Sequence, residues 1–134
     1  MNKTMIFFLA IFTAAGLSAA TPIPTAKIEV YYFHYTHRSK TCMNVENISR
    51  NAIVTLYPVK VKRGEIFFKS INLDEKEGAA LGAKVKIKEK TLVVILGDKR
   101  VDLTKKAFKY ANDHPEKLKE EIKKAVESVL KQGG

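Results

Sequence analysis

The sequence predicts an α/β domain whose four-stranded mixed sheet is flanked by helices. Short apolar runs rich in β-branched and aromatic residues alternate with segments whose apolar residues recur every three or four positions. Two late apolar runs are separated only by a tight turn, which predicts a hairpin. A long amphipathic segment closes the chain. The expected order is therefore β-α-β-α-β-β-α, with one extra short helix before the last.

The first predicted strand and helix lie in the first half of the chain. Residues 28–33 are apolar almost throughout, which predicts a central strand buried on both faces. A helical pattern follows from Cys42, and its apolar stripe is Val45, Ile48, Ala52, Ile53 and Leu56. The helix should end near Tyr57, because Pro58 disfavours helical geometry in the residue before it.

The middle of the chain predicts a loop, a strand and a short helix. Residues 59–63 alternate valine with lysine, and we expect a loop there, with a hairpin strand as the alternative. Residues 66–73 predict the second strand. Asp74 can cap a helix over residues 75–81, and Glu77 would complete a capping box.

A second pair of strands follows. Residues 84–90 alternate lysine with apolar residues and predict either a strand or an irregular approach to the next one. Residues 91–96 form a strong apolar run, which predicts a strand. Residues 97–99 predict a tight turn, and residues 100–103 should return as a short edge strand.

Two helices are expected at the C-terminal end. Thr104 can cap a helix that reaches Ala111. Asp113 can cap the last helix, which has Pro115 in its first turn and Glu116 three residues after the cap. The buried stripe of this helix is Leu118, Ile122, Ala125, Val126 and Val129. Residues 132–134 should fray.

The first twenty residues predict a secretory signal. Lys3 supplies a positive start, residues 5–15 are apolar, and residues 18–20 are small, as signal peptidase requires. An uncleaved membrane anchor is the alternative, although the apolar run is short for a membrane span. Cleavage after Ala20 would place the protein in the periplasm or outside the cell, with no membrane span left.

The rest of the chain predicts a short tether over residues 21–26 and one domain over residues 27–131. The sequence holds 24 lysine and arginine residues against 14 aspartate and glutamate residues, a formal net charge of +10. Removing Lys3 lowers this charge to +9. Export argues against a nucleic-acid partner, and no zinc-finger spacing or base-stacking motif supports one. The charge favours acidic partners or anionic surfaces of the cell envelope. No cofactor is expected.

The only cysteine, Cys42, lies where the first strand gives way to the first helix. A single cysteine excludes an internal disulfide and leaves a free thiol or an intermolecular bridge. A strand, a short loop and a helix with sulfur near its N-terminus form the redox site of thioredoxin-like proteins. Residues 39–42 have the spacing of their Cys-x-x-C motif, with Ser39 in place of the first cysteine.

Four segments together resemble a family of small exported thioredoxin-like bacterial proteins, the nitrophenyl-compound nitroreductase subunit ArsF-like family. These segments are Ile28-Glu29-Val30-Tyr31-Tyr32-Phe33-His34, Ser39-x-x-Cys42, Ile71-Asn72-Leu73-Asp74-Glu75 and Gly97-Asp98-Lys99. The resemblance covers residues 27–130 and implies a thioredoxin-like fold. It maps the two cysteines of the family's Arg-Cys-x-x-Cys loop onto Ser39 and Cys42.

The resemblance also implies which chemistry is missing. In thioredoxins the first cysteine attacks a substrate disulfide as a thiolate, and the second cysteine resolves the mixed disulfide. Ser39 occupies the attacking position, and its hydroxyl is far too basic to replace a thiolate. Thr91 occupies the place of the cis-proline that faces the motif in thioredoxins. The chain should therefore be unable to complete a disulfide exchange by itself.

We therefore expect a binding or monothiol redox-partner module that meets a protein or peptide, rather than a complete disulfide reductase. Tyr35, Arg38, Lys40 and Thr91 are the candidate partner-binding residues, whereas Tyr31 and Tyr32 should be core. Helix N-terminal amides and nearby positive charge would favour a Cys42 thiolate, and burial would disfavour it.

Two alternatives stay open. In the first, Cys42 forms an intermolecular disulfide as part of an oxidoreductase. In the second, the protein carries copper or zinc in the cell envelope on His34, His37 and Cys42, whose ligand types suit these metals. A closed zinc site usually takes four ligands, and the sequence offers no second cluster nearby.

Overall fold

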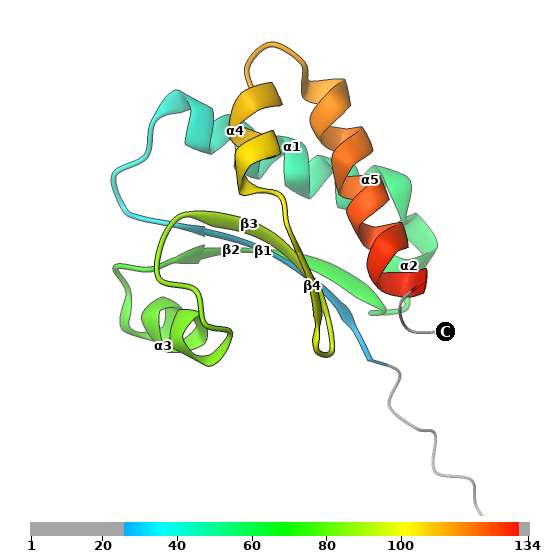
Figure 1. Cartoon of the computed structure of the whole chain (residues 1–134), viewed down its shortest axis with the longest axis horizontal. Coiled ribbons are helices and arrows are strands. Elements are labelled where there is room, and N and C mark those ends of the chain that lie inside the picture. The colour runs from blue at the N-terminus through cyan, green and yellow to red at the C-terminus, as the bar shows by residue number, and fades with distance from the viewer. Residues whose placement is uncertain (1–25, 132–134) are drawn as a thin grey trace, which may run out of the picture.

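The computed structural model describes residues 26–131 as a mixed sheet between helices (Figure 1). The predicted export signal, all but the last residue of the tether, and residues 132–134 lie outside the described residues. Within them the predicted α/β class is confirmed, and the arrangement is consistent with a thioredoxin-like fold.

The sheet has the strand order β2-β1-β3-β4. The strands are β1 (Ile28–His34), β2 (Ile66–Asn72), β3 (Thr91–Leu96) and β4 (Lys99–Asp102). β1 pairs in parallel with β2 and antiparallel with β3, and β4 pairs antiparallel with β3. β1 and β3 are buried almost throughout because they are the two central strands. All four strands were predicted from the sequence, within one residue at each end.

The helices cover the two faces of the sheet unequally. They are α1 (Lys40–Leu56), α2 (Pro58–Lys62), α3 (Lys76–Lys84), α4 (Thr104–Tyr110) and α5 (Pro115–Lys131). α3 lies on one face, and α1, α2, α4 and α5 lie on the other (Figure 1). The order therefore contains one more short helix, α2, than the sequence predicted.

Two apolar clusters fill the spaces on either side of the sheet. The five residues of the predicted stripe of α5 are all buried in the larger cluster. In α1, Val45, Ala52 and Ile53 are buried, whereas Ile48 and Leu56 are partly exposed. Tyr32 lies in the larger cluster and Tyr31 in the smaller one beneath α3, so both tyrosines are core as predicted.

The loop predicted over residues 59–63 is wrong, and so is its hairpin alternative, because α2 forms there. Pro58 ends α1 as expected, since Tyr57 leaves helical geometry with φ −129° and ψ 51°. The same proline then starts a new helix, because the first helical position needs no N–H donor. Val61 packs on the core and anchors the short helix.

The cap predicted for the third helix is also wrong. α3 begins after Glu75 with no side-chain cap, and the Asp74 carboxylate instead accepts a hydrogen bond from the Thr36 N–H at 2.7 Å. The helix extends past Gly82, which the sequence suggested would follow it. The glycines of α3 let the helix pack closely on its neighbours. A Cβ on Gly78, for example, would lie 1.9 Å from the Asn72 carbonyl oxygen at the end of β2.

Thr104 does not cap α4, because Leu103 occupies the cap position. The Thr104 hydroxyl accepts a hydrogen bond from the Leu92 N–H at 3.1 Å and donates one to Asp102 at 2.6 Å. Thr104 thus ties the start of α4 to two strands, which is a long-range role that the local sequence pattern does not reveal.

The cap predicted at Asp113 lies one residue too early. The His114 carbonyl accepts the first hydrogen bonds of α5, from the N–H groups of Lys117 and Leu118, so His114 holds the cap position. Residues 84–90 form no strand, which settles the open choice in favour of an irregular approach to β3.

Candidate functional site

Ser39 and Cys42 lie at the junction of β1 and α1, where the sequence placed them. Ser39 is the N-cap residue of α1, and its hydroxyl oxygen accepts a hydrogen bond from the Cys42 N–H at 3.2 Å. This bond satisfies one of the free amides at the start of the helix. It also fixes Cys42 in the first turn, where the Cys42 side chain points back over the cap.

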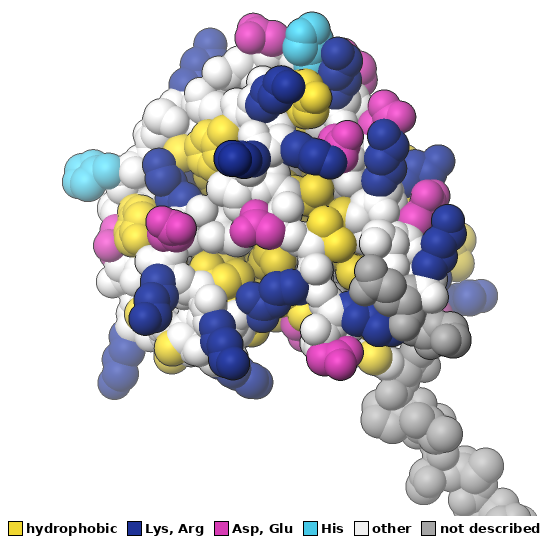
Figure 2. Space-filling view, in the orientation of Figure 1, with side chains coloured by type: hydrophobic (Ala, Val, Ile, Leu, Met, Phe, Trp, Pro, Cys, Tyr) yellow, Lys and Arg dark blue, Asp and Glu magenta, His cyan; other side chains and the backbone are white. Residues whose placement is uncertain are grey.

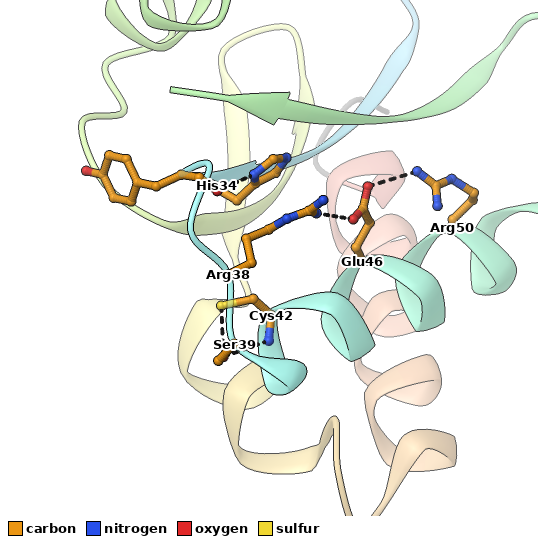
Figure 3. A network of polar contacts seen from close by, with 7 residues as sticks. His34, Arg38, Ser39, Cys42, Glu46 and Arg50 are labelled. Atoms are coloured by element: carbon orange, nitrogen blue, oxygen red, sulfur yellow. Dashed lines mark hydrogen bonds and ion pairs between the residues drawn. The ribbon is translucent and has the colours of Figure 1, made fainter. Parts of the chain in front are cut away.

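The Ser39 hydroxyl and the Cys42 thiol face each other (Figure 3). The Ser39 Oγ donates to the Cys42 Sγ at 3.3 Å. An oxygen therefore occupies the position next to the sulfur where a dithiol motif would hold a second sulfur. The pair can share a proton, but it cannot form a disulfide.

The environment of Cys42 both hinders and favours its thiolate. Burial raises the pKa of the Cys42 thiol, whereas hydrogen bonds from Ser39 and Tyr32 and the charge of Lys90 lower this pKa. The net result is a pKa below the ordinary value for cysteine. The buried Tyr32 hydroxyl has no partner at full hydrogen-bonding geometry among the described residues, so Ser39 is the better-aligned donor to the sulfur.

Access to the sulfur is restricted. Only 2% of the Cys42 surface is exposed, and Cys42 belongs to the larger apolar cluster. A disulfide exchange requires the attacking sulfur to approach the target disulfide in line. A partner disulfide cannot reach Cys42 unless the start of α1 or the preceding loop moves.

Side chains from two other parts of the chain hold the loop and the start of α1. Asn72 donates to the Thr36 hydroxyl at 3.0 Å, beside the Asp74 contact with the same residue. On the other side, the Asn112 amide donates to the Thr41 hydroxyl at 2.8 Å. No local sequence pattern marks these contacts, and only the positions of Asn72 at the end of β2 and of Asn112 after α4 point to them.

Arg38 enters an ion pair within the chain. Its guanidinium contacts the Glu46 carboxylate, which also binds Arg50 at 3.0 Å (Figure 3). Burial raises the pKa of Glu46, but the Ser70 hydroxyl and the two arginines lower it, so the net pKa is below the ordinary value. Arg38 keeps a side-chain exposure of 28% and is thus only partly available to a partner, whereas Lys40 is exposed.

Three adjoining hollows lie near the end of β1, and Lys90 in the wall of one of them acts on the Cys42 thiol through its charge. The first lies between residues 86–89 and β4, with Tyr35 and Thr91 in its wall. The second is lined by Tyr35, Phe108 and neighbouring residues, and the third by Phe108 and Lys105 among others. Tyr35 lines the first two hollows and Phe108 the last two, so the three hollows are neighbours on one surface.

We call this feature the Tyr35 groove. The first hollow has a volume of about 500 Å³, and the other two about 450 Å³ each. Its lining residues are Tyr35, Lys86, Ile87, Lys88, Glu89, Lys90, Thr91, Val93, Arg100, Asp102, Thr104, Lys105 and Phe108. Two of the predicted partner-binding residues, Tyr35 and Thr91, line it, whereas Arg38 and Lys40 do not. Lys90 connects it to Cys42, since the charge of Lys90 lowers the pKa of the Cys42 thiol.

The three candidate metal ligands are not assembled into a site. Among residues 26–131, no three histidine, cysteine, aspartate or glutamate side chains are grouped to hold a metal ion. His34 is buried, with its Nδ1 2.9 Å from the Tyr35 carbonyl oxygen, whereas His37 is exposed. No observation on the described residues therefore favours the metal-carrier alternative.

Comparison with known protein families and with curated proteins finds no match for this chain. None of the helices within residues 26–131 has the length and apolar character needed to cross a membrane. What the chain does is therefore inferred from the Ser39–Cys42 pair and the groove beside it.

Proposed function

We propose that this chain is an exported thioredoxin-fold module that binds a protein or peptide partner beside Ser39 and Cys42 and does not complete disulfide exchange by itself. The observation that carries the proposal is the buried lone thiol of Cys42, whose neighbour at 3.3 Å is a hydroxyl. The resemblance of residues 27–130 to exported thioredoxin-like proteins of the ArsF-like family agrees with this function.

The lone thiol limits the chemistry to one half-reaction. A Cys42 thiolate could attack a partner disulfide, form one new S–S bond and release one partner thiolate. Breaking the new bond requires a second thiolate, and Ser39 offers only a hydroxyl. Without a thiol from another molecule the partner would stay attached, so the chain cannot turn over as a reductase.

The Tyr35 groove is the surface best suited to a partner. It is open to solvent, it has two aromatic side chains, and it adjoins the redox position. The Tyr35 hydroxyl donates to the Lys88 carbonyl oxygen at 3.0 Å, which fixes the orientation of the ring. A fixed aromatic side chain can contact a peptide with little loss of conformational entropy.

A selection from a phage-displayed peptide library tests the binding function. The protein should retain a reproducible set of peptides, and the variant Phe108→Ala should lose most of them. The variant Lys123→Ala, at an exposed position of α5, is the control and should retain them. The absence of any enriched peptide, or equal retention by the Phe108→Ala variant, would contradict a partner site in the groove.

A monothiol role is the second candidate, and the lowered pKa of Cys42 favours it. In this role Cys42 would hold a partner through a mixed disulfide until another thiol releases it. Intact-mass measurement after incubation of the native protein with glutathione disulfide distinguishes the candidates. A glutathione adduct on Cys42 would support the monothiol role, and an adduct only after denaturation would support a binding module with an inaccessible thiol.

A further inference from the structure

We infer that the Tyr35 groove selects an acidic peptide segment bound in an extended form. This inference rests on the proposed function, because it names the partner class of the same surface. Five basic and two acidic residues line the groove: Lys86, Lys88, Lys90, Arg100 and Lys105 against Glu89 and Asp102. Figure 2 shows lysine and arginine side chains around exposed apolar ones on the face that carries β4 and α4.

The five cations exceed the two carboxylates by three charges, and hydrogen bonds hold one of these carboxylates in place without removing its charge. One oxygen of the Asp102 carboxylate already accepts hydrogen bonds from the Thr104 N–H at 2.8 Å and the Thr104 hydroxyl at 2.6 Å. Asp102 is therefore engaged in holding the start of α4. Glu89 is the one groove carboxylate for which the described residues show no such bond to its oxygens.

The backbone of Lys86 gives a second, independent indication. After α3 the Lys86 N–H bonds to the Ala83 carbonyl at 3.2 Å, and the Ile87 N–H bonds to the Gly82 carbonyl at 2.7 Å. This is a helix-ending motif whose turning residue normally is glycine. Lys86 occupies that position with a φ of 60°, where a side chain causes backbone strain.

A strained residue in a binding surface is a reason to ask what its side chain does. A glycine would make the same turn with less strain, but it would supply no charge to the groove. Lys86 is exposed and lines the first hollow together with Lys88. Between them Ile87 is buried in the smaller cluster, so the segment that presents both lysines is anchored to the core.

The shape of the groove favours a peptide over a membrane surface. The charges line hollows between the 86–90 segment, β4 and α4, with Tyr35 and Phe108 among the walls. An extended peptide can place alternate side chains against aromatic rings and against lysines. A bilayer surface cannot enter a hollow of this kind.

Fluorescence anisotropy with two labelled octapeptides tests the inference. One alternates valine with glutamate, and the other alternates valine with glutamine. The glutamate peptide should bind more tightly, and added salt should weaken its binding. The double variant Lys86→Gln/Lys88→Gln should weaken it by roughly tenfold, at about threefold for each lost charge. The control Lys123→Gln/Lys124→Gln removes the same charge from α5 and should change affinity by less than about twofold.

A third variant separates charge from folding. Lys86→Gly relieves the backbone strain, so it should bind the glutamate peptide more weakly although its structure is not impaired. If the protein bound both peptides with equal affinity and the Phe108→Ala variant bound neither, the acidic preference would be overturned and the binding function would stand. Binding of neither peptide would overturn the acidic-peptide inference, whereas the binding function itself is decided by the phage-display selection. Equal losses of affinity in the two double variants would also overturn the acidic-peptide inference. So would displacement of the peptide by phosphatidylglycerol vesicles but not by neutral vesicles.

Discussion

At the scale of single residues, Ser39 determines what Cys42 can do. Its hydroxyl oxygen accepts a hydrogen bond from the Cys42 N–H in the first turn of α1, and its O–H donates to the Cys42 sulfur. It therefore stabilises both the start of the helix and the thiolate. It supplies no second sulfur. One side chain therefore caps the helix beside Cys42 but gives this thiol no partner sulfur.

The variant Ser39→Ala should raise the pKa of Cys42, because the thiolate loses the hydrogen bond from the Ser39 hydroxyl. The thiolate absorbance near 240 nm, followed against pH, measures this change. Thr41→Ala is the control, since the Thr41 hydroxyl bonds to Asn112. An unchanged or lower pKa in Ser39→Ala would contradict the role assigned to this hydrogen bond.

The variant Lys86→Gly should stabilise the protein by about 1 kcal/mol, because glycine adopts the left-handed backbone conformation without a Cβ clash. Urea unfolding followed by circular dichroism measures the change. Lys84→Gly, inside the last turn of α3, is the matched control and should destabilise the protein by a similar amount. Destabilisation by Lys86→Gly would show that the Lys86 side chain contributes more to folding than its backbone costs.

Glu46 links the stability of the fold to pH. The pKa of Glu46 is lower in the folded protein than in the unfolded chain, so its contribution is present above the unfolded pKa of about 4.3. The contribution is lost as the pH falls through the lower folded value. Glu46→Gln should therefore cost about 1 kcal/mol at pH 7, since solvent screens the partly exposed arginines.

Urea unfolding at pH 7 and at pH 3 measures this dependence. The difference between wild type and Glu46→Gln should shrink at the lower pH. A difference that stays constant or grows on acidification would show that the carboxylate charge is not what stabilises this network.

At the scale of helices and strands, the sequence predicted what depends on local pattern. The apolar stripe of α5 and the run at residues 91–96 were recognised because their spacing alone reveals them. α2 was missed because a proline that ends one helix can also start the next. The caps at Asp74 and Thr104 were misassigned because distant backbone groups, at Thr36 and Leu92, compete for their oxygens.

The end of α3 was misplaced for a related reason. Gly82 suggested a helix stop, but it lies inside α3. The chain after the helix packs against it, since the Ile87 carbonyl oxygen would lie 2.7 Å from a Cβ on Gly82. A glycine needed for close approach and a glycine needed for a turn cannot be told apart without knowing what packs against them.

The variant Gly78→Ala should destabilise the protein by about 2 kcal/mol or more, because its Cβ would lie 1.9 Å from the Asn72 carbonyl oxygen and the backbone must shift. At an exposed helical position the same change would be stabilising by about 1 kcal/mol. A thermal melt checks the sign. A rise in Tm would mean that α3 does not pack as closely on the end of β2 as described.

The candidate site was predictable only in part. Ser39 and Cys42 are neighbours in sequence and lie at a strand–helix junction, so their placement followed from local pattern. The groove is not local, because Tyr35, residues 86–90 and Phe108 come together only when the sheet forms. The sequence contained its lysines and aromatic residues but did not show that they share one surface.

At the scale of the whole molecule, the fold places the single cysteine at the start of α1, beside the hydroxyl of Ser39. The variant Ser39→Cys should form an internal disulfide with Cys42, because the present O–S distance of 3.3 Å needs only a small adjustment. Thiol counting after air oxidation measures this, and Ser39→Cys/Cys42→Ala is the control. Two free thiols in oxidised Ser39→Cys would contradict the geometry described for this pair.

The most direct test of the account is the incubation of insulin with a stoichiometric amount of the pre-reduced purified protein, in the absence of any other thiol. A lone thiol cannot release a captured substrate, so the wild-type protein should yield no fully reduced insulin chains by mass spectrometry. Pre-reduced Ser39→Cys should release such chains and acquire an internal disulfide. Release of fully reduced insulin chains by the wild-type protein, absent in Cys42→Ala, would contradict the central claim that this fold binds a partner without completing disulfide exchange.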